Sequence, residues 1–136
     1  MSAEWPNISV GDEASFEIMV TEDMVSKFVE VSGDDNPLHA DSSFAVLKGF
    51  SKKVAHGMLL GSLFSRLVGR HFFGDDNLYI SQTLQFRKPV LIGDTVLVKG
   101  VITDKIESAK ILRIRTTIES GGTVAISGEA QVTLIV

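Results

Sequence analysis

The chain has 136 residues, a net charge of −4 and no cysteine. Its length fits one domain of roughly 100–200 residues, and 44% hydrophobic with 22% charged residues indicates a globular protein. The acidic balance argues against a nucleic-acid partner, and the lack of cysteine excludes disulfides and thiolate catalysis. No uncharged apolar stretch approaches the ~20 residues that span a bilayer. We therefore expect one cytoplasmic domain over residues 1–136, without a membrane partner.

The first third of the chain predicts a strand followed by two helices. Residues 13–20 have the character of a short strand. Thr21 suits the N-cap of a helix with an acidic first turn, and Gly33 suits its left-handed C-terminal position. Residues 34–41 form a polar, turn-rich segment, at whose end Asp41 is placed to cap a short second helix.

Residues 54–73 predict one long helix with a continuous apolar face. A second face carries a small residue at every fourth position, namely Gly57, Gly61, Ser65 and Gly69. Each glycine inside a helix costs about 1 kcal/mol relative to alanine, so close approach of a sheet or a ligand is expected there. We expect this helix to be buried on most sides. His71, near its end, is expected to interact with the last helical carbonyls.

The second half of the chain predicts antiparallel strands. Apolar and polar residues alternate from residue 78 to residue 86, and further strands are predicted at 95–104, 110–120 and 123–135. The adjacent glycines 121 and 122 predict a tight hairpin between the last two strands. The element order predicts an α+β fold, with an antiparallel sheet of about five strands wrapped around the central long helix.

Potentially reactive side chains are concentrated in residues 34–41. This segment contains three carboxylates and one imidazole, those of Asp34, Asp35, His39 and Asp41. An aspartate and a histidine can hold one water molecule between them, with one accepting its proton and the other transferring a proton to substrate. The same residues also fit an ordinary turn followed by a helix cap. Both interpretations remain open on the spacing alone.

A second candidate feature is His56-Gly57-Met58, at the start of the long helix. The N-terminus of a helix presents unpaired N–H groups and a partial positive charge, which suit a developing oxyanion. A glycine there leaves room for a carbonyl to approach. Alternatively, Gly57 only begins the row of small residues, and His56 is a capping residue.

Two motifs carry a resemblance to a known family, Asp34-x-Asn36-Pro37-x-His39-x-Asp41 and His56-Gly57-Met58. Together they resemble the MaoC-like hydratases, and among these the (R)-specific enoyl-CoA hydratases of bacterial polyhydroxyalkanoate supply. The resemblance covers nearly the whole chain. It implies the hot-dog fold, a helix wrapped by an antiparallel sheet, which agrees with the architecture expected from the element order.

The resemblance implies reversible syn hydration of a trans-2-enoyl thioester to the (R)-3-hydroxyacyl thioester. By position, Asp34 and His39 match the catalytic pair that activates water, and Gly57 matches the residue whose N–H binds the thioester oxygen. Ser65 matches a supporting serine on the central helix, and Asn36 matches the asparagine that shapes the loop. No metal or other cofactor is expected, because a thioester already acidifies its α-carbon.

The sequence says less about the acyl carrier and about the oligomeric state. Arg87 and Lys88, with Lys52 and Lys53, flank the expected site and are candidates to meet the phosphates of coenzyme A or of an acyl-carrier-protein arm. Val68 is a candidate to line the acyl pocket. Proteins of this kind associate as dimers, and an open sheet edge favours such pairing, so a homodimer is expected.

Four alternatives to a hydratase of enoyl-CoA remain. A (3R)-hydroxyacyl-acyl-carrier-protein dehydratase would use the same chemistry on another carrier. A hot-dog thioesterase often places an acidic residue on the central helix, and residues 54–73 contain none. A non-catalytic acyl-binding module would keep the fold without turnover. A non-haem iron enzyme would use His39, Asp41 and His56 as ligands.

Overall fold

The computed structural model of the chain describes residues 4–73 and 75–135. A short 3-10 turn, η1 (Trp5–Asn7), precedes the main elements. The helices are α1 (Glu22–Ser32), α2 (Pro37–Ala40), α3 (Ser42–Leu47) and α4 (Gly57–Arg66), which continues as the π-helical segment η2 (Leu67–Phe72). The strands are β1 (Glu13–Met19), β2 (Asn77–Gln82), β3 (Gln85–Phe86), β4 (Thr95–Ile106), β5 (Ile111–Ser120) and β6 (Thr123–Leu134).

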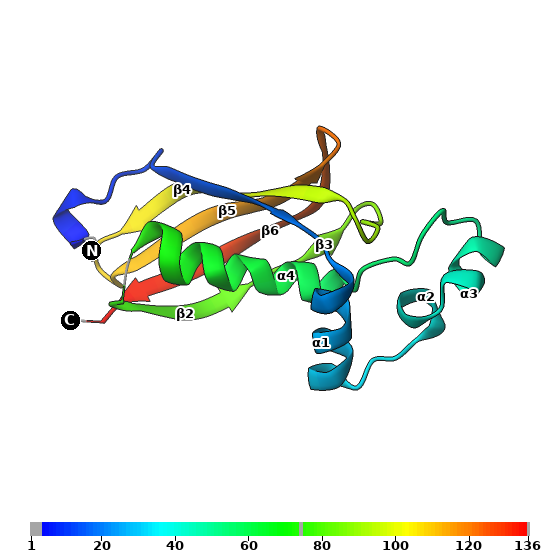
Figure 1. The fold of residues 1–136 in the computed structure, drawn as a ribbon. Helices are drawn as coiled ribbons and strands as arrows, with labels where there is room; N and C mark the ends of the chain where they lie inside the picture. The colour runs from blue at the N-terminus through cyan, green and yellow to red at the C-terminus, as the bar shows by residue number, and fades with distance from the viewer. Residues whose placement is uncertain (1–3, 74, 136) are drawn as a thin grey trace.

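The strands form one antiparallel sheet in the order β1-β4-β5-β6-β2, and β3 also pairs with β6. The long helix α4 lies along one face of this sheet, and α1, α2 and α3 gather beyond the end where α4 begins (Figure 1). The predicted α+β hot-dog architecture is confirmed. The sheet has six strands instead of about five, because the alternating run at residues 78–86 is divided into β2 and β3.

Local capping defines the first helices much as the sequence predicts. The Thr21 hydroxyl accepts a backbone N–H of the first turn of α1 at 3.2 Å, and Gly33 ends α1 with φ +76°. The Asp41 carboxylate accepts two N–H groups at the start of α3. Within the segment expected to be a turn, Asn36 caps the additional short helix α2, whose first residue is Pro37. An asparagine N-cap followed by proline is a favoured way to begin a helix.

The central helix is less enclosed than the sequence suggests. Its apolar face is buried in the core, through Leu59, Leu60, Leu63, Phe64, Leu67 and Val68. However, Met58 is 59% exposed, and Ser62 and Ser65 lie on the same solvent-facing side. The expectation of burial on most sides was therefore wrong for the single chain, because the sheet covers only one side of α4. Among the described residues, no helix is long and apolar enough to cross a bilayer.

The row of small residues on α4 is partly explained by side chains from the sheet. A Cβ atom on Gly57 would lie 2.6 Å from the ring of Phe86, and one on Gly61 would lie 2.9 Å from Leu84. A larger residue at either position would have to displace these side chains. A Cβ atom on Gly69 would meet nothing within 4 Å, so the steric reason does not extend to that end of the row.

His71 has other partners than the helical carbonyls that were expected. Its ring stacks on Phe16 with the centroids 4.6 Å apart, and its Nε2 accepts a hydrogen bond from Arg66 Nε at 3.3 Å. The guanidinium of Arg66 also lies 4.1 Å above the Phe16 ring. His71 therefore belongs to a small stacked cluster between η2 and β1.

Candidate active site

The short helix α2, which contains the candidate catalytic histidine, is hydrogen-bonded to the segment that leads into α4. Leu38 O accepts the Val54 N–H at 3.1 Å, and His39 Nδ1 lies 2.6 Å from Val54 O. Because a carbonyl oxygen can only accept, His39 Nδ1 must carry a proton. In the neutral ring, the lone pair therefore lies on Nε2. The His39 side chain is 15% exposed, so Val54 fixes a mostly buried imidazole with a known orientation.

Asp34 is held at three of its polar groups. Its N–H donates to Ser32 Oγ at 3.1 Å, and its carboxylate Oδ1 accepts the Asn36 N–H at 3.2 Å. Its carbonyl oxygen accepts a hydrogen bond from His56 Nε2 at 2.9 Å. These contacts do not use the carboxylate Oδ2, which is therefore available to a substrate or a water molecule. The side chain is 51% exposed, so a substrate or water molecule can reach it.

The free carboxylate oxygen of Asp34 faces the free nitrogen of His39. Asp34 Oδ2 and His39 Nε2 are 3.9 Å apart, which is too far for a direct hydrogen bond. One water molecule placed beside both atoms would be within hydrogen-bonding distance of each. The geometry is therefore suited to acid–base work on a bound water, as expected for the pair.

His56 contacts both members of this pair. It precedes α4 in the N-cap position but makes no side-chain capping bond. Its ring stacks on His39 with the centroids 3.8 Å apart and tilts against Phe28 at 4.8 Å. The side chain is 2% exposed, and within residues 4–73 and 75–135 its Nδ1 has no hydrogen-bond partner.

The same cluster contains three potential metal ligands. Asp34, His39 and His56 each offer one ligand atom within 4.8 Å of the others. However, His56 Nε2 must carry a proton because it donates to Asp34 O. The lone pair of the neutral ring is then on Nδ1, at a different edge of the imidazole. Asp41, which the iron alternative required, caps α3 and is not part of the cluster. The donor set does not fit the iron alternative.

A pocket of about 360 Å³ opens beside this cluster. It is lined by His39, Val54, Ala55, Gly57, Met58, Leu60, Phe86, Arg87, Lys88, Pro89, Val90 and Ile126. Gly57 is the first residue of α4, so its N–H has no intrahelical acceptor, and no hydrogen bond from it to another described residue is found. The pocket therefore brings a helix N-terminal donor and the candidate catalytic imidazole to one largely apolar space.

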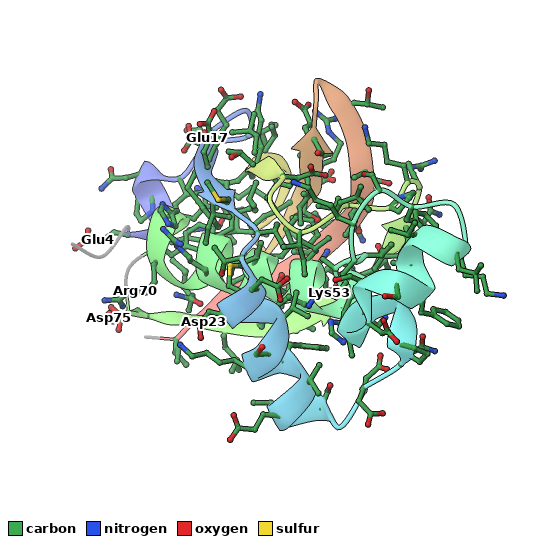
Figure 2. The ribbon with its side chains drawn as sticks, turned by 45° about the vertical axis from the view of Figure 1, so that its right-hand side comes forward. Glu4, Glu17, Asp23, Lys53, Arg70 and Asp75 are labelled. Carbon is green, nitrogen blue, oxygen red and sulfur yellow. The ribbon has the colours of Figure 1, made fainter. Side chains whose placement is uncertain are left out.

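Two basic side chains of the predicted set reach the pocket wall. Arg87 donates to Ser127 Oγ at 2.7 Å and to the side chain of Gln85, and Lys88 donates to Ser120 O at 2.9 Å. Each cation keeps further donor hydrogens for a ligand. Lys53, by contrast, is paired with a carboxylate of α1 at 2.6 Å, near the start of α4 (Figure 2).

Two predicted residues lie apart from the pocket. Ser65 is exposed on the outer side of α4, and it is not among the lining residues. Val68 is fully buried in a second core cluster beneath β5 and β6, in the π-helical continuation of α4. The structure of one chain therefore joins Asp34, His39 and Gly57, but it does not bring Ser65 or Val68 to them.

The chain is similar to known hydratases and dehydratases in both sequence and fold. Residues 8–123 match the family model described as MaoC like domain. The chain is 38% identical to the (R)-specific enoyl-CoA hydratase of Aeromonas caviae, over 98% of this chain and 99% of that protein. It is 41% identical to a mitochondrial 3-hydroxyacyl-[acyl-carrier-protein] dehydratase of Arabidopsis thaliana, over 66% of this chain and 53% of that protein. The unliganded R-hydratase PhaJ1 of Pseudomonas aeruginosa superposes with a TM-score of 0.93 at 30% identity, covering 98% of this chain and 86% of that one.

Proposed function

The chain belongs to the MaoC-like domain family, and from this premise we propose that it is an (R)-specific enoyl-CoA hydratase. The reaction is the reversible syn addition of water to a trans-2-enoyl thioester, which gives the (R)-3-hydroxyacyl thioester. The observation that carries the proposal is the 3.9 Å gap between Asp34 Oδ2 and His39 Nε2, beside the pocket that Gly57 lines.

Asp34, His39 and the Gly57 N–H together meet the three requirements of the reaction. These are activation of water, stabilisation of the negative thioester oxygen and protonation of C2. Asp34 and His39 hold the water while its oxygen bonds to C3 of the enoyl group, and one of them accepts its proton. The Gly57 N–H stabilises the negative charge that develops on the thioester oxygen. A proton is then delivered to C2 on the face from which the water attacked, which makes the addition syn. No net proton is consumed, and Asn36 keeps the Asp34 carboxylate in place through its backbone N–H.

The pocket wall supports a position for the thioester beside Gly57. An apolar lining beside Gly57 suits the enoyl chain, and Arg87 and Lys88 place positive charge at the same pocket. Both cations are suited to the phosphates of a coenzyme A carrier. The alternative is a 3-hydroxyacyl-acyl-carrier-protein dehydratase, because the similarity to the plant mitochondrial dehydratase reaches 41% identity and the reaction centre would be unchanged.

We further propose that two copies associate. Strand β2 is an edge strand of the sheet, and its outward side chains Leu78 and Ile80 are 53% and 47% exposed. Met58 on the uncovered side of α4 is 59% exposed. An exposed edge strand with apolar side chains readily pairs with another chain, and antiparallel pairing of two β2 strands would extend the sheet and cover apolar surface along this edge.

The direct test is incubation of the purified protein with crotonyl-CoA and with a crotonyl-acyl-carrier protein. We expect loss of enoyl absorbance, with only the (R)-3-hydroxyacyl product on chiral analysis and the faster turnover on coenzyme A. A faster reaction on the carrier protein would support the dehydratase alternative. Release of free coenzyme A without hydration would contradict both and support a thioesterase. Short, medium and long enoyl chains then define the pocket depth.

A further inference from the structure

We propose that His56 is a positioning residue that sets the relative placement of Asp34 and His39. This inference rests on the proposed hydratase function. His56 contacts both members of the pair, through a hydrogen bond to Asp34 O and a ring stack on His39. It is 2% exposed and does not appear in the pocket wall, so it acts through these residues and not on substrate.

The first contact fixes the backbone from which the Asp34 carboxylate extends. His56 Nε2 lies 2.9 Å from Asp34 O and 4.0 Å from Asp34 Oδ2. Only the carbonyl is within hydrogen-bonding distance, so the carboxylate oxygen stays available for the water. Without this hydrogen bond, Asp34, the first residue after the C-cap of α1, would no longer be held to the start of α4. Misplacement of a reacting group by about 1 Å can cost about 10²-fold in rate.

The second contact limits rotation of the His39 ring. The His56 ring contacts both the His39 and the Phe28 rings, with centroid distances of 3.8 Å and 4.8 Å. Val54 O fixes one edge of the His39 imidazole, and the His56 ring covers one of its faces. The hydrogen bond and the stack together define the direction of His39 Nε2 toward Asp34. One buried side chain thus restrains both ends of the 3.9 Å gap.

Packing alone does not explain a histidine at this position. Within the described part of the chain, His56 Nδ1 is buried and has no hydrogen-bond partner. Leaving such a group unsatisfied costs about 1–3 kcal/mol. A phenylalanine would have a similar ring for the stack without that cost. A histidine at this position is explained by the hydrogen bond that its other nitrogen, Nε2, donates to the carbonyl oxygen of Asp34.

The test begins with His56→Phe, which keeps a ring but removes the donor to Asp34. We expect kcat for crotonyl-CoA hydration to fall by about tenfold or more, with KM changed less than about twofold. The melting temperature should not fall, because an unsatisfied buried nitrogen is removed. The matched control is His71→Phe, which removes a hydrogen bond from another stacked histidine, away from the pocket. Its kcat should equal that of the wild type.

Two further variants separate positioning from a general structural role. His56→Gln retains an N–H donor, so its kcat should exceed that of His56→Phe. In the Asp34→Asn background, His56→Phe should cost less than about twofold, because the group that it positions no longer acts. Full additivity of the two substitutions, or equal kcat in the Phe and wild-type proteins, would overturn the proposal.

A structural measurement tests the inference even if the proposed activity fails. Crystal structures of the wild type and His56→Phe should show Asp34 Oδ2 and His39 Nε2 farther apart in the variant by about 1 Å or more. An unchanged separation would overturn the positioning role. Wild-type protein that does not hydrate any enoyl thioester would contradict the proposed function, while this comparison would still decide whether His56 positions the pair.

Discussion

Asp34 and Asp35 are adjacent in the chain, but their carboxylates lie in different environments. Asp34 has hydrogen bonds to its N–H, its carbonyl and one carboxylate oxygen, and the second oxygen faces the His39 ring. Asp35 is exposed, and its backbone N–H bonds to Gly33 O. The loop therefore orients one carboxylate toward the imidazole and leaves its neighbour in solvent. This difference favours Asp34 as the base and makes Asp35 a control.

Removal of either member of the pair should reduce turnover strongly. Asp34→Asn keeps the shape of the side chain without its charge, and His39→Gln removes the imidazole. Each should lower kcat for crotonyl-CoA by about 10²-fold or more, because acid–base assistance contributes about 10²–10⁴-fold. Steady-state kinetics with circular dichroism would measure this, and Asp35→Asn should retain wild-type kcat. Near-normal turnover in both variants would show that the pair is misassigned.

Tyr79 provides a separate prediction about stability and pH. It is the only tyrosine, and its hydroxyl donates to the side chain of Gln82 on the same strand. Burial raises its pKa to about 12, from an ordinary value of 10.0. The folded state therefore favours the neutral phenol. This contribution is fully present below pH 10 and is lost as the pH rises toward 12.

The titration can be followed without interference from another phenol. We expect the tyrosinate absorbance of the folded protein to rise around pH 12 and that of the urea-unfolded protein around pH 10. The urea midpoint of the wild type should decrease over this interval more than that of Tyr79→Phe. Equal folded and unfolded titration midpoints would contradict the burial of this side chain.

At the scale of elements, the N-terminus of α4 combines a free donor with a tight steric contact. A Cβ atom on Gly57 would lie 2.6 Å from the Phe86 ring, so every substitution there disturbs the pocket wall. Alanine and proline share this disturbance, but only proline lacks the N–H. Proline is tolerated at the first helical position, and His56 has the extended φ −60°, ψ 131° that a following proline requires.

Comparison of Gly57→Ala with Gly57→Pro therefore isolates the proposed oxyanion donor. Both variants should lose some activity through displacement of Phe86. The proline variant should have a kcat lower than that of the alanine variant by about 10²-fold, as expected for loss of one oxyanion donor. Steady-state kinetics with matched melting curves would measure the difference. Equal kcat values would contradict a catalytic role for the Gly57 N–H.

Strand β6 contains the tightest glycine of the sheet. A Cβ atom on Gly128 would lie 1.8 Å from the backbone oxygen of Thr83, between β2 and β3. Since backbone cannot move aside as a flexible side chain can, Gly128→Ala should lower the free energy of unfolding by about 1–3 kcal/mol or more. Gly69→Ala meets nothing within 4 Å and should be neutral or stabilising by up to about 1 kcal/mol. Urea unfolding of both variants tests this, and equal stabilities would contradict the close contact.

These elements also show what can be predicted from sequence. The limits of α1 and α3 follow from Thr21, Gly33 and Asp41, because a cap satisfies backbone groups within a few residues of itself. The candidate residues Asp34 and His39 were predicted from one motif and its resemblance to a family. The contact of His56 with Asp34 could not be predicted, because this hydrogen bond joins segments 22 residues apart. The π-helical continuation of α4 has no recognised local signal either.

At the scale of the whole molecule, one chain leaves two parts of the fold uncovered. The outer side of α4 faces solvent, and β2 is a free edge of the sheet. The pocket is also open to solvent. The enoyl chain of a thioester, by contrast, needs apolar walls around it. A second copy paired along β2 would cover the exposed apolar side chains of this edge and extend the sheet. The proposed dimer would thus explain why the single chain has a free edge at β2 with exposed apolar side chains.

Charge on this edge should separate the copies without unfolding them. Leu78 and Ile80 are about half exposed, so Leu78→Glu with Ile80→Glu adds carboxylates that one chain can keep in water. In a paired edge the same four carboxylates would be buried close to one another, which opposes association strongly. We expect light scattering after size exclusion to give twice the chain mass for the wild type and the single mass for the variant, with melting still cooperative. Val10→Glu, an equally exposed apolar position near the N-terminus, should leave the mass unchanged. A wild-type monomer, or a double variant that remains dimeric, would contradict pairing through β2.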